Sequence, residues 1–285
     1  MSPPLPHMRL VLCEGAHDLW VMRRVLEHQH GWSTHKVTLD ALPYPLGHFV
    51  KSRVNDHYLK VKAHQAGAPE TPNFSLVMKH PEADFLLAFF TGNGGLNTAC
   101  TSWLDDARKT FQPRHFGRPS TGTADAVAST SVAVLVDGDA DPASAIARVE
   151  SWWGGPVVAG GWTGGPAMEP LGQLGLWVWP DGVGLVPGTM EPVIDGVDGG
   201  PTGTPGSEIV TLLDEHAPDD CKYAKGHGVA LSARRTKARL GVQAQWASPG
   251  SSWASWLRDI GLSKNYIDDT AVLNRVGEWL AAGVP

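Results

Sequence analysis

The sequence predicts an α/β protein built on a mostly parallel, doubly wound (Rossmann-like) sheet with helices on its faces. Short apolar runs at 8–13, 84–90, 132–136 and 174–179 have the length of strands that are buried on both faces. Residues with helical spacing follow the first three of these runs. Because strands that alternate with helices pair in parallel through right-handed connections, this order indicates one continuous sheet.

The run 8–13 predicts a strand, and the residues after it predict a tight turn and a helix. Apolar residues at helical spacing indicate the helix: Leu19, Met22, Val25 and Leu26. Residues 33–82 combine several prolines with basic side chains. We expect this stretch to be an insertion that loops out of the sheet with small elements of its own.

The run 84–90 predicts the second core strand, and the glycine-rich residues 91–95 turn the chain before a further helix. The run 132–136 predicts the third strand. Asp141 then fits the N-cap and Pro142 the first position of the next helix.

The run 174–179 predicts the fourth strand, and we expect a long loop after it that includes residues 189–192 and 195–206. The sequence thus predicts one α/β domain over 8–245, preceded by a disordered tail at 1–7. Residues 246–285 are expected to form a helical extension packed on the same domain, with apolar stripes at Trp253, Trp256, Leu257 and Ile260 and at Val272, Val276, Trp279 and Leu280.

Charge is divided unevenly along the chain, whose formal net charge is −6. Residues 119–220 contain fifteen Asp and Glu and one basic residue, Arg148, whereas residues 221–257 contain six Lys and Arg and no carboxylate. This division indicates either a metal site beside a strip that binds polyanions or two surfaces that neutralise each other. The three cysteines form no CxxC pair, which excludes a zinc ribbon.

Acidic side chains follow three of the predicted strands at their carboxyl ends. They are Glu14 and, one helical turn later, Asp18 after the first strand, Asp137 and Asp139 after the third, and Glu191 beyond the fourth. Open α/β sheets place their sites at this edge. Carboxylates brought together raise one another's pKa unless a cation neutralises them, and their oxygens suit Mg²⁺ or Mn²⁺. The sequence therefore predicts a divalent-metal site.

These motifs resemble a known family. An apolar strand ending in EGxxD (Glu14 to Asp18) precedes one ending in DxD (Asp137 and Asp139), with the glycine turn 91–95 between them and Thr189-Met190-Glu191 after them. The pattern is similar to the toprim domain of topoisomerases, bacterial primases and OLD-family nucleases. The closer likeness is to small stand-alone toprim-like proteins and to the toprim half of OLD nucleases.

The resemblance implies a metal-dependent nuclease that hydrolyses phosphodiester bonds with Mg²⁺ or Mn²⁺ as cofactor. It assigns a metal-binding role to Glu14, Asp18, Asp137, Asp139 and Glu191, and a catalytic role to Glu14 and to Lys237, with Lys225 as the alternative lysine. The basic strip would bind the nucleic-acid backbone without reading sequence through Lys222, Lys225, Arg234, Arg235 and Arg239.

The chain departs from the larger members of the family. It has no GxxxxGK[ST] motif of an ATPase and no zinc-binding cysteine set. Two alternatives stay open: a non-catalytic toprim module that binds nucleic acid or a protein partner, and a haloacid-dehalogenase-type phosphatase. In the phosphatase, Asp137 would be the nucleophile and Asp139 the general acid.

Simpler roles are also open for individual residues. Glu14 could accept hydrogen bonds at the start of the first helix, and Asp141 fits a helix cap better than a ligand. Lys237 could belong to a solvated face, and His17 to the surface at a helix start.

Nucleic acid is the expected partner, DNA in preference to RNA, and a homodimer is an open option. Residues 1–7 lack the apolar stretch of a secretory signal, and no apolar run approaches the ~18 residues of a membrane helix. We therefore expect a cytoplasmic protein without a membrane partner, with DNA repair or phage defence as a suitable setting.

Overall fold

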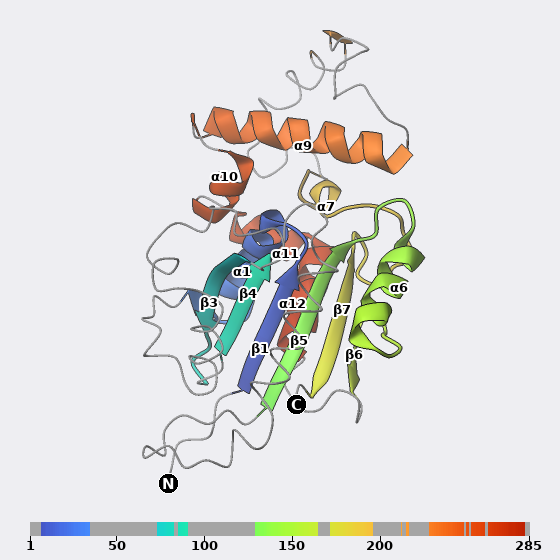
Figure 1. The fold of residues 1–285 in the computed structure, drawn as a ribbon. Helices are drawn as coiled ribbons and strands as arrows, with labels where there is room; N and C mark the ends of the chain where they lie inside the picture. Colours follow the sequence, from blue (N-terminus) through green and yellow to red (C-terminus); the bar gives the residue numbers. More distant parts are fainter. Residues whose placement is uncertain are drawn as a thin grey trace.

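The computed structural model describes residues 7–34, 73–82, 85–90, 129–164, 172–195, 212, 215–216, 228–247, 249–250, 252–259 and 262–282. Within them the chain forms a seven-stranded sheet in the order β2-β3-β4-β1-β5-β7-β6, with helices on both faces (Figure 1). The strands are β1 His7–Cys13, β2 Ser33–Thr34, β3 Asn73–Lys79, β4 Phe85–Phe90, β5 Ser129–Asp137, β6 Gly161–Gly164 and β7 Gln173–Trp179. The α/β prediction is confirmed.

The four strands predicted from apolar runs form the centre of this sheet. β4, β1, β5 and β7 pair in parallel, and their side chains are apolar almost throughout, as expected of strands covered on both faces. The outer strands pair antiparallel with their neighbours: β3 with β4, β2 with β3 and β6 with β7. The sheet is therefore mixed, with a parallel core.

The prediction that residues 33–82 loop out of the sheet is wrong at both ends of that stretch. β2 and β3 lie in it and extend the main sheet beyond β4, and the Ser33 hydroxyl donates to the carbonyl of Lys79 at 3.3 Å. An insertion outside the sheet is left only for residues 35–72, which lie outside the described residues, as do the glycine turn 91–95 and the helix expected after it.

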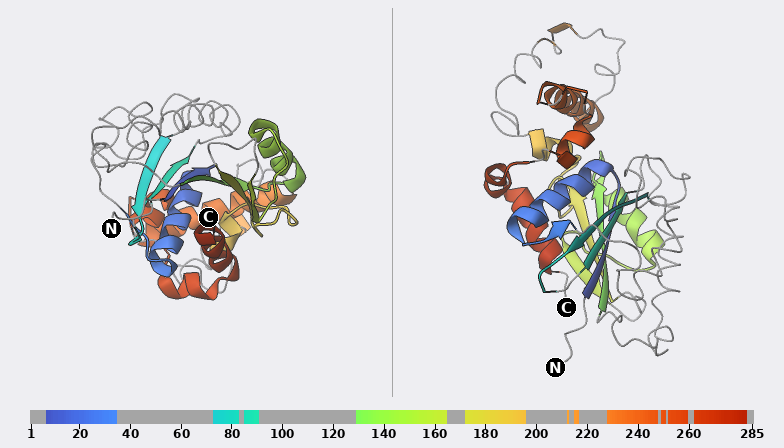
Figure 2. Two further views of the ribbon diagram at one scale, coloured as in Figure 1. Left: turned by 90° about the horizontal axis from the view of Figure 1, so that it is seen from below. Right: turned by 90° about the vertical axis from the view of Figure 1, so that its left-hand side faces the viewer.

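Helices cover the two faces of the sheet as Figure 2 shows. They are α1 Ala16–Gln29, α6 Pro142–Trp153, α7 Glu191–Asp195, α9 Gly228–Ala247, α10 Trp253–Asp259, α11 Lys264–Asp269 and α12 Ala271–Ala282. α1 and α12 lie on one face and α6 on the other (Figure 2), while α9 crosses the edge at which β1 and β5 end (Figure 1). The predicted Asp141 cap is confirmed, since its carboxylate accepts from the Ala143 N–H at 3.2 Å.

The sequence analysis did not predict α9, α11, β6 or α7. Residues 161–164 form the edge strand β6 because their backbone pairs with β7 despite the two glycines. Residues 189–192 were expected to be loop, but α7 begins at Glu191.

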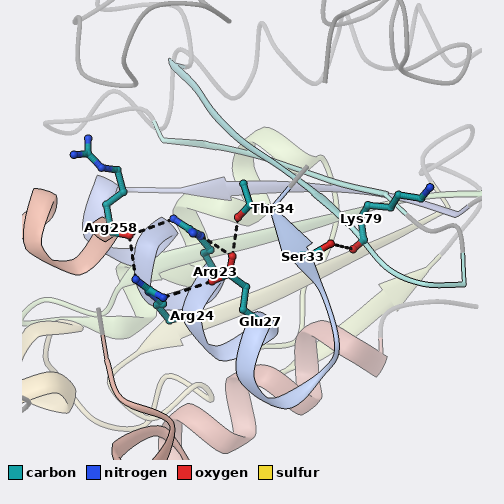
Figure 3. Close-up of polar contacts among 7 residues, drawn as sticks. All are labelled: Arg23, Arg24, Glu27, Ser33, Thr34, Lys79 and Arg258. Carbon is teal, nitrogen blue, oxygen red and sulfur yellow. Dashed lines mark hydrogen bonds and ion pairs between the residues drawn. The ribbon is translucent and has the colours of Figure 1, made fainter. Parts of the chain in front are cut away.

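The C-terminal helices pack on α1 through apolar and polar contacts. Arg23 and Arg24 of α1 both donate to the carbonyl of Arg258 near the end of α10, at 3.3 and 3.2 Å (Figure 3). Glu27 pairs with Arg23 at 2.8 Å and accepts from the Thr34 hydroxyl at 2.7 Å. This network joins α1, α10 and β2. Within the described ranges, no helix is both long and apolar enough to cross a membrane.

Gly175 of β7 lies beneath a tryptophan pair from the edge strand and the last helix. The rings of Trp162 and Trp279 stack with centroids 5.3 Å apart, and each indole N–H donates to a backbone carbonyl of the other's segment. A Cβ at Gly175 would lie 2.8 Å from Trp279 and 2.9 Å from Trp162. The backbone of β7 therefore has to lack a side chain here.

We expect Gly175→Ala to lower the free energy of unfolding by about 1–3 kcal/mol, because the added methyl overpacks the two rings. Gly241→Ala on α9 is the matched control: its new Cβ meets nothing within 4 Å, and alanine favours helix, so stability should rise by up to about 1 kcal/mol. Urea unfolding followed by circular dichroism measures both. Equal effects of the two substitutions would contradict the packing argument.

Candidate functional site

The predicted acids lie at the point where the connections from neighbouring parallel strands leave toward opposite faces of the sheet. β1 continues into α1 on one face, and β5 continues into α6 on the other (Figure 2). In open α/β sheets, ligands bind at such a switch point, in the crevice beyond the carboxyl ends of the strands. Glu14 follows β1 directly, and its N–H donates to the Leu135 carbonyl of β5 at 3.2 Å.

Glu14 lies beside Asp137, although 123 positions separate them in the sequence. Its Oε2 accepts the backbone N–H of Asp137 at 3.2 Å. The same oxygen lies 3.9 Å from Nη2 of Arg148 on α6. The glutamate is therefore held at the crevice by one backbone donor and one cation from a different layer of the fold.

Asp18 occupies the third position of α1 and closes the turn after β1. Its Oδ2 accepts the N–H of Gly15 at 2.8 Å, which is the acidic half of a capping box. Only 4% of Asp18 is exposed. The EGxxD spacing thus has a local explanation, and it also fixes a buried carboxylate next to Glu14.

The DGD motif is shaped by its glycine. Gly138 donates its N–H to the Trp179 carbonyl at 3.0 Å, and a Cβ there would lie 2.7 Å from that oxygen. Asp137 accepts the Met190 N–H at 3.1 Å through Oδ1. Asp139, in contrast, has a left-handed backbone (φ 46°), is exposed, and pairs through its backbone with Gly188.

Glu191 and Lys237 form the other side of the site. Glu191 begins α7, is 3% exposed, and holds Nζ of Lys237 at 2.9 Å through Oε1. Within the described part of the chain, its buried Oε2 has no hydrogen-bond partner, nor has the buried hydroxyl of Thr189. The hydroxyl of Tyr266 on α11 donates to the carbonyls of Val193 and Ile194 and so anchors α7.

Burial and the neighbouring acids raise the pKa values of two carboxyls at this site, Asp18 and Asp137. Burial, helped by the charges of Glu191 and Glu14, raises the pKa of Asp18 to about 8, although the Gly15 N–H and Lys237 act to lower it. Burial likewise raises the pKa of Asp137 well above its ordinary value, with contributions from Asp18, Glu191 and Glu14. These four carboxylates therefore form one electrostatic unit that needs a proton or a cation.

Lys237 and His17 respond to the same charges. Burial opposes the charged form of Lys237, but Glu191, Asp137 and Asp18 outweigh it and raise the pKa of the lysine. Burial lowers the pKa of His17 to about 4, with Glu191 opposing and Lys237 contributing. His17 is therefore neutral near pH 7 and half-buried at the site, which corrects the interpretation of this residue as a surface histidine.

The donor set has the chemistry of a site for a hard divalent cation. It offers oxygens only, two of its acids have raised pKa values, and Oε2 of Glu191 is buried without a partner among the described residues. As arranged here, however, no group of three or more His, Cys, Asp or Glu in the described ranges is placed to hold a metal ion. Each carboxylate is engaged by its own donor instead.

The structure brings together most of the predicted site residues: Glu14, Asp18, Asp137, Glu191 and Lys237. Asp139 differs from these residues because it is exposed, and its backbone pairs with Gly188. Arg234, Arg235 and Arg239 lie on α9 with Lys237, whereas Lys222 and Lys225 lie outside the described residues. The alternative between Lys237 and Lys225 thus stays a prediction.

Arg148 is a site residue that the sequence analysis did not select. The sequence could have indicated it, because Arg148 is the one basic residue in the acidic stretch 119–220. Its place beside Glu14 depends on how α6 lies against the sheet, which the local sequence does not specify.

Comparison with known proteins adds little to this geometry. No family model matches the chain, and no curated protein matches it. Among solved structures, the crystal structure of a hypothetical protein from Pyrococcus horikoshii OT3 aligns over 96% of this chain and 99% of its own, with 15% identity and a TM-score of 0.42. A likeness at this level carries no argument about family or function.

The raised pKa of Asp18 predicts how metal-free protein responds to pH. The folded state keeps a proton that an unfolded Asp, with its ordinary pKa of 3.8, has lost, so this contribution to stability is fully present below about pH 4 and is lost as pH rises through about 8. The Asn side chain in Asp18→Asn can still accept the Gly15 N–H but does not ionise. We therefore expect this variant to lose less stability than the unmodified protein as pH rises.

The measurement is the melting temperature in EDTA at about pH 5 and about pH 8.5. The fall for Asp18→Asn should be smaller than for the unmodified protein by roughly 5 °C, or about 1–2 kcal/mol. Asp269→Asn, at an exposed position on α11, is the matched control and should behave like the unmodified protein. An unchanged pH dependence in Asp18→Asn would show that Asp18 is ionised in the folded state.

Proposed function

We propose that this protein is a toprim-like, metal-dependent nuclease that hydrolyses phosphodiester bonds in nucleic acid. One observation supports this above all: Glu14, Asp18, Asp137 and Glu191 converge at the switch point of a parallel sheet, with Lys237 beside them. Four carboxylates in a crevice are costly unless a cation joins them. Oxygen ligands of this kind favour Mg²⁺ or Mn²⁺.

In this proposal Glu14, Asp137 and Glu191 hold the metal, with Asp18 and Asp139 in support. The bound metal would lower the pKa of water and offset charge on the phosphate. Lys237 stabilises the extra negative charge of the phosphate in the transition state. Its ammonium has three donors, and Glu191 uses one of them while fixing the lysine in place.

The surface around the site supports a polyanion as substrate. α9 carries Lys237 together with Arg234, Arg235 and Arg239, and it crosses the sheet edge at which the acids lie (Figure 1). Lysine and arginine side chains bind backbone phosphates, which carry no sequence information, so the proposal is cleavage without sequence preference, with DNA favoured over RNA.

The first test incubates purified protein with supercoiled plasmid or single-stranded RNA in Mn²⁺, Mg²⁺ or EDTA. We expect nicking or cleavage with the metals and none with EDTA. Glu14→Gln should lower the rate at least about 100-fold, because it removes the charge next to Asp137. Glu82→Gln, at a side chain that is 83% exposed, is the matched control and should cleave normally. Full activity in Glu14→Gln or in EDTA would refute the proposal.

The second test concerns Lys237. Lys237→Gln should lower kcat by about 10²–10³-fold while KM changes little, because the lysine acts mainly on the transition state. Lys264→Gln on α11 removes an exposed lysine that pairs with Asp268, away from these acids, and should leave kcat unchanged. An equal loss of kcat in both variants would mean that Lys237 contributes only through its general positive charge and not through a specific contact in the transition state.

A non-catalytic toprim module is the second candidate function. It is favoured by the finding that no ready-made metal site is present among the described residues. In that case nucleic-acid or protein binding would survive Asp137→Asn and Asp139→Asn, and no cleavage would occur in either metal. The plasmid assay therefore separates the two candidates.

A further inference from the structure

Arg148 approaches the acids from a different layer than Lys237 does. It belongs to α6, which is fixed against the sheet by the buried side chains of Ala145, Val149 and Trp153. α6 lies on the face opposite α1 (Figure 2), whereas Lys237 comes from α9 at the sheet edge (Figure 1). The four acids are thus flanked by one cation near Glu14 and one near Glu191.

The contact of Arg148 with Glu14 leaves most of the guanidinium unused. Nη2 lies 3.9 Å from Oε2 of Glu14, longer than the ~2.8 Å of a charge-assisted hydrogen bond, and that oxygen already accepts the Asp137 N–H. Nε of Arg148 is buried and has no hydrogen-bond partner in the part of the chain that the structure describes. An arginine has five donors, and buried donors without acceptors are costly.

The neighbouring acids of α6 do not supply the missing acceptor. Glu150 accepts the Val157 N–H at the far end of the helix, and Asp141 accepts from Ala143 and Ser144 at its start. The Glu14 carboxylate is itself a proposed metal ligand, so its charge is shared once a cation is bound. The Arg148 side chain, which is 29% exposed, then has donors available for another acceptor.

We infer that Arg148 binds a backbone phosphate of the nucleic-acid substrate, on the side of the carboxylate cluster opposite Lys237. A guanidinium suits this role because its planar fork donates two parallel hydrogen bonds to a phosphate. With Lys237, it would hold the strand from both sides of the acids and fix its path across the crevice. This inference rests on the proposed function and adds a substrate-binding residue to it.

The test is binding, measured without turnover. Fluorescence anisotropy follows a fluorescein-labelled oligothymidylate and a labelled duplex in Ca²⁺, over a series of salt concentrations. Arg148→Gln should weaken binding about 10-fold at low salt and reduce the slope of log K against log salt by about 0.7 for the single strand and about 0.9 for the duplex, because one phosphate contact is lost. Arg148→Lys should keep the slope and lose part of the affinity.

Arg275→Gln, at an exposed position on α12, is the control and should match the unmodified protein. Arg148→Met keeps the apolar stem and gives the same measurement if Arg148→Gln does not fold. An unchanged salt slope in these variants, with or without slower cleavage, would overturn the inference and leave Arg148 as a positioning residue for Glu14. If the unmodified protein neither binds these probes nor cleaves plasmid, the proposed function itself fails.

Discussion

The parallel pairing of β1 with β5 is the contact on which the site depends. Its register places Cys13 opposite Leu135, so Glu14 follows β1 beside the last two residues of β5. Two hydrogen bonds continue the pairing one step further: Glu14 N–H to Leu135, and Asp137 N–H to the Glu14 carboxylate. A slip of one residue would turn every side chain of β1 to the other face and separate the two acids.

Charge balance is the second constraint, and it couples the layers of the fold. Acids from the end of β5, from the turn after β1 and from α1 and α7 interact with one another, and the cations that oppose them come from α6 and α9. Without a divalent ion, the cluster is tolerated because Asp18 and Asp137 take up protons readily and the other two acids hold cations. A bound ion would have to draw the carboxylates together, which links its affinity to small movements of α7 and α9.

The sequence predicted the strands whose two faces are both buried. It did not predict elements and contacts that depend on how neighbouring elements pack. The run 132–136 could be recognised as a strand because both of its faces are apolar, and its parallel course predicted that Glu14 and Asp137 would meet. β6 could not be recognised, since Gly161–Gly164 is a strand only through the backbone of β7. Asp139 was expected in the cluster because of its spacing, but the left-handed turn after Gly138 leaves it exposed. Contacts such as that of Arg148 depend on the docking of whole helices.

The hydroxyl of Tyr266 has a consequence for the cooperativity of the molecule. It joins α11 to the carbonyls of Val193 and Ile194 in α7, the short helix that begins at Glu191. Loosening of α11 is therefore coupled to loosening of α7, and amide exchange in the two helices should proceed at a common rate.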